Sequence, residues 1–147
     1  MKNKLVLIAA VVMAIVFIYL KISASWPTYR EVIINDTTIR AEIADTIGKQ
    51  QKGLSGRDSL GENQGILFIF GLPSQRSFWM KEMKFPIDII WLRDGKVVEI
   101  TENLPPPRGF ETPASVTSKE LVDTVLEVNV GFARKYNIKV DDLVAGY

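Results

Sequence analysis

The chain contains no cysteine and no histidine among its 147 residues. Without cysteine it can form no disulfide bond, no thiol nucleophile, no CxxC redox pair and no acylated lipoprotein cysteine. Without histidine it has no imidazole base, no Ser-His-Asp triad and no ordinary zinc site. Asp141 and Asp142 form only a pair, whereas a calcium site needs several oxygen ligands. We therefore expect no metal site, no bound cofactor and no catalysis by any of these routes.

The chain also lacks an excess of either charge. The chain has 18 Lys and Arg residues against 17 Asp and Glu residues. When Lys2, Lys4 and Lys21 are removed from the count, residues 26–147 carry 15 basic and 17 acidic side chains, a net charge of −2. Non-specific nucleic-acid binding depends on neutralising phosphates with Lys and Arg. This part of the chain is therefore not expected to bind nucleic acid.

The N-terminus contains the longest hydrophobic run. Lys2 and Lys4 precede sixteen apolar or weakly polar residues, Leu5–Leu20, and Lys21 follows them. The run is longer than a usual signal-peptide core of about 7–15 residues and shorter than a comfortable membrane span of about 20. Because the Lys21 side chain can reach the membrane surface, residues 5–22 form a marginal span. A buried core helix is disfavoured, since no polar face interrupts the run.

Residues 1–25 are thus either an uncleaved membrane anchor, which we favour, or a signal peptide cleaved near Ser23-Ala24-Ser25. The two N-terminal lysines favour a cytoplasmic N-terminus in both cases. Residues 26–147 are then expected outside the cytoplasm, in the periplasm or the extracellular space. They would be anchored to the membrane, or secreted if the leader is cleaved.

Residues 26–147 are predicted to form a single compact β-rich domain. Asn35-Asp36 and Asp94-Gly95 are hairpin turn signals between alternating or apolar runs. The strand-like segments are Tyr29–Asn35, Thr37–Ala44, Gly65–Phe70, Ser77–Met80, Ile87–Arg93, Lys96–Thr101 and Asp123–Asn129.

Two short helices are expected, over residues 45–52 and over Val130–Asn137. Thr117 and Glu120 also fit a capping box for one helical turn. No βαβ alternation is visible, which favours antiparallel pairing. The predicted fold class is therefore mainly β with two short helices (α+β), a small antiparallel barrel or sandwich preceded by an N-terminal hydrophobic helix.

Several stretches of the domain resemble the domain-of-unknown-function family 192, whose members are small β-rich proteins. They keep the order and approximate spacing of that family over residues 40–144, and are Gln51–Leu60, Gly65–Phe70, Phe78–Lys81, Pro86–Gly95, Val125–Gly131 and Ile138–Val144. Ser55 stands where the family usually has Met, Glu82-Met83 replaces the usual Asn-Thr, and Asp141 replaces a Gly. The resemblance implies a compact β fold and no particular reaction.

Five side chains are candidates for a speculative ligand-binding site: Arg57, Trp79, Lys81, Asp88 and Glu127. Trp79 beside Lys81 could line a pocket for a sugar ring or an anionic ligand, although a core tryptophan next to a strand-end lysine is the simpler interpretation. Arg57, in a glycine-rich turn, could grip a carboxylate of a ligand or of the protein itself.

Asp88 and Glu127 are the two acids with potential for chemistry. Asp88 lies in an apolar strand segment, and a buried carboxylate needs an ion pair or hydrogen bonds unless its pKa rises. Glu127 is either a solvated strand residue or a partner of Asp88 in a glycosidase-like acid pair. The sequence alone does not place the two carboxylates near each other, so no residue is assigned a catalytic role.

The leading hypothesis is a non-catalytic, membrane-tethered extracytoplasmic domain that binds a small ligand or an envelope partner. The alternative is an envelope hydrolase that uses Asp88 and Glu127 as paired carboxylates, roughly 5–9.5 Å apart in an open cleft. A third hypothesis is a structural assembly factor with an exposed apolar patch of more than a few hundred Å².

Overall fold

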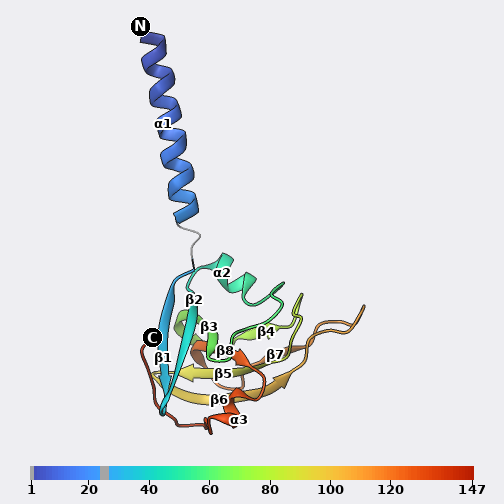
Figure 1. Ribbon diagram of the computed structural model, residues 1–147. Coiled ribbons are helices and arrows are strands. Elements are labelled where there is room, and N and C mark those ends of the chain that lie inside the picture. Colours follow the sequence, from blue (N-terminus) through green and yellow to red (C-terminus); the bar gives the residue numbers. More distant parts are fainter. Residues whose placement is uncertain (1, 24–26) are drawn as a thin grey trace.

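The computed structural model describes residues 2–23 and 27–147 (Figure 1). Helix α1 spans Lys2–Ser23, so the expected N-terminal helix is present, and it projects away from the β-rich region. Its apolar side chains between Val6 and Tyr19 are exposed. Within the part of the chain that the structure describes, no helix meets the length and hydropathy needed to cross a membrane. The expected boundary at residues 25 and 26, and Ala24 of the expected cleavage segment, lie outside the described residues.

The regular structure of the remaining described chain is mainly β-sheet, as predicted. The strands are β1 (Tyr29–Ile34), β2 (Thr37–Ala44), β3 (Gln64–Ser74), β4 (Ser77–Trp79), β5 (Ile87–Arg93), β6 (Lys96–Leu104), β7 (Ser115–Thr117), β8 (Val122–Asn129) and β9 (Val144–Ala145). Seven strands form one curled sheet in the order β6-β5-β8-β3-β2-β1-β9, and β4 pairs with β7 in a second sheet. The sheet curls into a half-barrel, so the expectation of a barrel or sandwich is confirmed only in its coarse form.

The two short helices are α2 (Ile47–Lys52) and α3 (Phe132–Lys135), which lie near opposite ends of the sheet (Figure 1). Together with α1 they make three helices in the described residues. The helical turn expected from Thr117 and Glu120 is wrong. Residues Ser115–Thr117 form β7 instead, because they pair with Ser77–Trp79 of β4. A local capping pattern is thus overridden by strand pairing between distant segments.

One pair of strands corrects the expectation of an antiparallel sheet without a βαβ unit. Strands β2 and β3 are parallel and are joined through α2, whereas the other neighbouring pairs are antiparallel. Parallel neighbours need a crossover connection, which often contains a helix. Here the helix is a short six-residue segment, so the βαβ pattern was too weak to recognise in the sequence.

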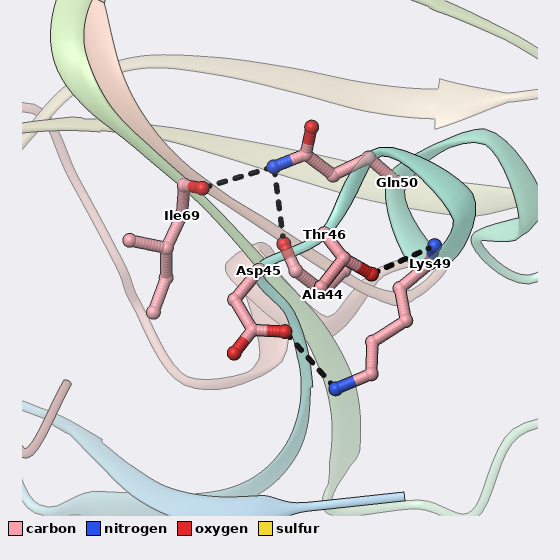
Figure 2. Close-up of polar contacts among 6 residues, drawn as sticks. All are labelled: Ala44, Asp45, Thr46, Lys49, Gln50 and Ile69. Carbon is pink, nitrogen blue, oxygen red and sulfur yellow. Dashed lines mark hydrogen bonds and ion pairs between the residues drawn. The ribbon is translucent and has the colours of Figure 1, made fainter. Parts of the chain in front are cut away.

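Polar contacts tie α2 to the strands that it connects (Figure 2). The Gln50 side-chain amide donates to the carbonyl of Ala44 at 3.3 Å and to that of Ile69 at 2.9 Å. The backbone N–H of Lys49 donates to the hydroxyl of Thr46 at 3.4 Å, which caps the helix. These contacts fix α2 against the end of β2 and the middle of β3.

Apolar side chains cover both faces of the curled sheet. We call the cluster on the concave face the inner core; it includes Ile34, Ile39, Leu67, Ile90, Leu126, Val128 and Phe132. We call the cluster on the convex face the outer core; it includes Leu54, Ile66, Phe68, Met80, Ile89, Trp91 and Val125. The β4–β7 sheet contributes Phe78 to the outer core, where its ring packs edge-on against Phe68 and Trp91 at centroid distances of 4.8 and 5.5 Å.

The C-terminal segment links the two edges of the curled sheet. Val144 pairs with Ile34 of β1, and its backbone N–H donates to the carbonyl of Gly95 at 2.9 Å. On the same segment, the Asp142 carbonyl accepts from the Val97 N–H at 3.0 Å. The segment therefore supplies hydrogen-bond partners to strands at both edges, which would otherwise expose unpaired backbone groups.

Gly146 allows this segment to run close to β1. Its φ is +88°, and a Cβ atom built on it would lie 1.9 Å from the carbonyl oxygen of Glu31. We expect Gly146→Ala to displace the C-terminal segment and lower the free energy of unfolding. The matched control is Gly71→Ala, because Gly71 has a φ of +78° and no atom within 4 Å of its Cβ position.

The control should lose only the about 1–2 kcal/mol that an L-residue pays in this backbone region. Urea unfolding measures both losses, and hydrogen exchange at the Val97 amide reports whether its bond to Asp142 is broken. Equal losses for the two variants, with Val97 still protected, would show that the approach of Gly146 to β1 is not needed for stability.

Candidate functional site

Asp88 is fully buried and serves a structural role. One carboxylate oxygen accepts from the backbone N–H of Asn103 at 2.9 Å and the other from that of Ala133 at 3.1 Å. The ladder between β5 and β6 shifts register at this point, and Asn103 has a φ of +55°. Ala133 lies in the first turn of α3, whose capping residue Gly131 offers no side chain. Asp88 thus satisfies two backbone donors that lack strand or cap partners.

The structure does not bring Asp88 and Glu127 together. In the register of β5 and β8, Asp88 lies opposite Val128, whereas Glu127 lies opposite Ile89. Val128 belongs to the inner core and Ile89 to the outer core. Because paired residues of a sheet share a face, the two carboxyl groups lie on opposite faces. The acid pair that the hydrolase hypothesis requires is therefore not formed.

Glu127 is buried on the convex face, with only 6% of its surface exposed. Its cross-strand neighbours, Ile66 on β3 and Ile89 on β5, are both apolar. Within the described residues, its carboxyl group has no hydrogen-bond partner. Burial raises the pKa of Glu127 to about 8, although the charge of Arg57 acts in the opposite direction. The group is therefore mostly protonated at neutral pH and available as a hydrogen-bond donor.

Arg57 is a partly exposed cation whose charge acts on Glu127. Its Nη2 atom donates to an oxygen of Glu42 at 2.7 Å, and its side chain remains about one-third exposed, at 34%. Glu42 on β2 lies opposite Ile66 of β3, which in turn lies opposite Glu127 of β8. Glu42, Ile66 and Glu127 therefore form a row across the convex face. The positive charge of Arg57 acts on both acids, as an ion pair with Glu42 and through its effect on the pKa of Glu127. Of the two partners expected for Arg57, the structure shows a carboxylate of the protein, that of Glu42.

A cleft of about 540 Å³ opens between α2 and the convex face of the sheet. Its walls are formed by Glu42, Asp45, Thr46, Gly48, Lys49, Lys52, Gly53, Arg57 and Ile66. Glu127 does not itself line the cleft, but it is the cross-strand neighbour of Ile66, which does. The cleft thus combines an apolar floor with charged walls, and it is our candidate ligand site.

Trp79 and Lys81 lie elsewhere. Trp79 is 59% exposed on β4, which contradicts the interpretation of it as a core residue. The Lys81 Nζ atom lies 5.2 Å from the centre of its ring, in a cation–π contact. Strand alternation instead directs Phe78 and Met80 into the outer core. Neither Trp79 nor Lys81 is among the residues that line the cleft.

Three residues of the cleft were missed by sequence reasoning. Glu42 has the alternation of a solvated strand residue, and Lys49 and Lys52 belong to a short amphipathic helix that predicts nothing by itself. The parallel pairing of β2 with β3 sets Glu42 two strands from Glu127. Within residues 2–23 and 27–147, no group of three or more Asp or Glu side chains is placed to hold a metal ion.

Comparisons with known proteins agree with the resemblance seen in the sequence. The profile of DUF192, described as uncharacterized ACR, matches residues 30–146. The chain belongs to the DUF192 family. The residue motifs that predicted this membership are thereby confirmed, and the family description carries no reaction.

Two solved structures are similar to this DUF192 chain. One is a protein from Sinorhizobium meliloti 1021 named as a proposed transcription regulator, with 27% identity, a TM-score of 0.73, and coverage of 82% of this chain and 95% of its own. The other is a protein of unknown function from Novosphingobium aromaticivorans DSM 12444, with 29% identity, a TM-score of 0.73, and coverage of 83% and 94%. Comparison with curated proteins gives no match.

The raised pKa of Glu127 predicts how its contribution to the free energy of unfolding depends on pH. Above pH 4.5 the unfolded chain releases a proton that the folded chain keeps until about pH 8, so this group destabilises the fold progressively across that window. Glu127→Gln keeps the size and removes the ionisation. We expect the unfolding free energy of the variant, relative to the unaltered protein, to increase between about pH 4.5 and pH 8 and then to level off.

Urea unfolding at several pH values measures this difference. Glu31→Gln, at an exposed position of β1, is the matched control and should show no such trend. A difference for Glu127→Gln that stays constant across the window would mean that Glu127 ionises as freely in the folded chain as in the unfolded one.

Proposed function

We propose that this DUF192 protein is a non-catalytic binding domain held at a membrane on the extracytoplasmic side, and that the cleft beside α2 takes a small ligand. The observation that carries the proposal is Glu127, a buried carboxyl group without a hydrogen-bond partner in the described residues. A buried polar group that lacks a partner is costly, and a ligand that hydrogen-bonds to it recovers that cost. The cleft volume of about 540 Å³ is typical of small-molecule sites.

A non-catalytic role is supported by the way the two acids are used. Both oxygens of Asp88 accept backbone N–H groups, and Glu127 faces the opposite side of the sheet. The chain has no histidine or cysteine that could act as a second catalytic group in place of a paired acid. Ligand binding does not require a pair of neighbouring acids, whereas the hydrolysis considered above does.

Contact with an envelope protein is a second candidate. Leu72, Trp79, Phe110 and Leu121 are exposed large apolar side chains in the region around β4 and β7. Single exposed apolar residues are normal, whereas several grouped around one pair of strands favour a contact with another protein. This candidate also fits the expectation of an assembly factor.

Membrane attachment is supported by α1. Its apolar side chains from Val6 to Tyr19 are exposed, and they belong to the segment, residues 5–22, expected to contact a membrane. Lys2 and Lys4 at its start favour a cytoplasmic N-terminus, which would put the β-rich domain in the periplasm or the extracellular space. Transcription regulation, proposed for the Sinorhizobium relative, is not carried over, since residues 26–147 have a net charge of −2.

The cleft can be blocked at Gly48. This residue lies in α2, lines the cleft, and has no atom within 4 Å of its Cβ position. In a ligand-observed NMR screen of small fragments, we expect hits for the unaltered chain and for Gly48→Ala, and their loss in Gly48→Phe. Hits that persist in Gly48→Phe, or a screen without hits, would contradict the proposal.

Membrane attachment predicts the distribution of the full chain after cell fractionation. It should sediment with membranes and resist alkaline carbonate. Val12→Arg should weaken this attachment, because an arginine at the centre of a membrane helix costs about 2.5–3.5 kcal/mol on insertion scales. Lys4→Arg is the control that keeps the charge pattern. Recovery of the unaltered chain in the soluble fraction would contradict attachment, and a shortened chain outside the cell would indicate a cleaved leader.

A further inference from the structure

The cleft beside α2 carries one more positive than negative side chain. Lys49 pairs with Asp45 at 3.0 Å, and Arg57 pairs with Glu42 at 2.7 Å. Lys52, the third cation of the cleft, has no ion-pair partner within the described residues. Its Nζ atom lies 3.5 Å from the Cβ position of Gly56, so the side chain folds back toward the turn that carries Arg57. The surplus charge is thus held next to Arg57.

Arg57 also has donors to spare. A guanidinium group has five N–H donors, and only Nη2 has a protein acceptor among the described residues, the Glu42 carboxylate. Arg57 is also the one described charged side chain whose charge acts on Glu127. Glu42, two strands away from Glu127, is paired with Arg57, and the strand neighbours Ile66 and Ile89 are apolar.

The cleft therefore presents the guanidinium N–H groups of Arg57 and the Lys52 ammonium group, and the protonated Glu127 carboxyl belongs to the strand position next to Ile66. Guanidinium and ammonium donors that protein acceptors only partly occupy favour an oxyanion ligand. With Glu127 protonated, the three cations and two anions of the cleft leave a single positive charge. A monoanion neutralises this charge, whereas a dianion would add negative charge beside Glu42 and Asp45.

We propose that the cleft takes a small monocarboxylate, with its carboxylate group held by Arg57 and Lys52, its apolar part on Ile66, and Glu127 donating a hydrogen bond to it. This inference rests on the proposed function, because it names the ligand class of the same cleft. It requires Glu127 to carry its proton when the ligand is bound. Ionisation of Glu127 above about pH 8 then repels the ligand and competes for Arg57.

The test is a titration of the full chain in non-ionic detergent, followed by NMR or calorimetry. The probes are acetate, hexanoate and benzoate, with benzamide as the neutral match for benzoate and inorganic phosphate as an anion of higher mean charge. At pH 7 we expect at least one monocarboxylate to bind with a Kd below about 10 mM. Benzamide and phosphate should bind at least about tenfold more weakly, and the carboxylate should bind about tenfold more weakly at pH 9.

Four variants separate the roles of the side chains. Arg57→Gln and Lys52→Gln should each weaken carboxylate binding, and Lys52 is exposed, so its variant keeps the test valid if Arg57→Gln unfolds. Glu127→Gln should retain binding at pH 7 and lose the pH dependence. Arg134→Gln is the matched control, because Arg134 pairs with Glu102 at 2.7 Å on a different part of the surface. It should leave binding unchanged.

The outcomes distinguish this inference from the proposed function. Benzamide binding as well as benzoate, or phosphate binding better than both, overturns the monocarboxylate assignment and leaves the cleft as a ligand site. Carboxylate binding that does not change in Arg57→Gln and Lys52→Gln overturns it too. If no monocarboxylate binds while other fragments still compete at the cleft, the inference alone fails. If no fragment binds there at all, both fail.

Discussion

The structure depends on a sheet whose central strands are apolar on both faces. Along β5, Ile90 and Leu92 enter the inner core while Ile89 and Trp91 enter the outer core. Each face must be covered, because the hydrophobic effect penalises either one if it is left in water. The concave face is covered by the curl of the sheet and by α3, and the convex face by the loop after α2 and the β4–β7 sheet. The candidate cleft lies where this outer cover ends.

Asp88 and Glu127 are both buried, but the energetic cost of burying a carboxyl group is met in a different way at each. Asp88 compensates its burial by accepting two backbone N–H groups, at a ladder irregularity and at the start of α3. Glu127, on the neighbouring strand, has no such donors and keeps its proton instead. A satisfied carboxylate contributes to stability, whereas an unsatisfied one lowers it. Local conflict of this kind is found most often at functional sites.

Much of the fold could be predicted from local sequence. The hairpins at Asn35-Asp36 and Asp94-Gly95 form where expected, since their turn residues accept positive φ, +54° at Asn35 and +51° at Asp94. The parallel β2–β3 pair and strand β7 could not be predicted in this way. Both depend on partners far along the chain. The segments of β2 and β3 are recognisable as strands but their pairing is not, and the three residues of β7 are too few to carry a distinctive pattern.

The sequence by itself determined the absence of thiol and imidazole chemistry, the family, the positions of most strands and the burial of Asp88. Only the tertiary structure decided that Asp88 and Glu127 face opposite sides and that Arg57, Glu42 and Glu127 share one side. The physical reason is the two-residue period of a strand. Which face a side chain occupies relative to another strand depends on the register between them, and a slip of one residue reverses it. Register between distant strands is set by packing of the whole sheet.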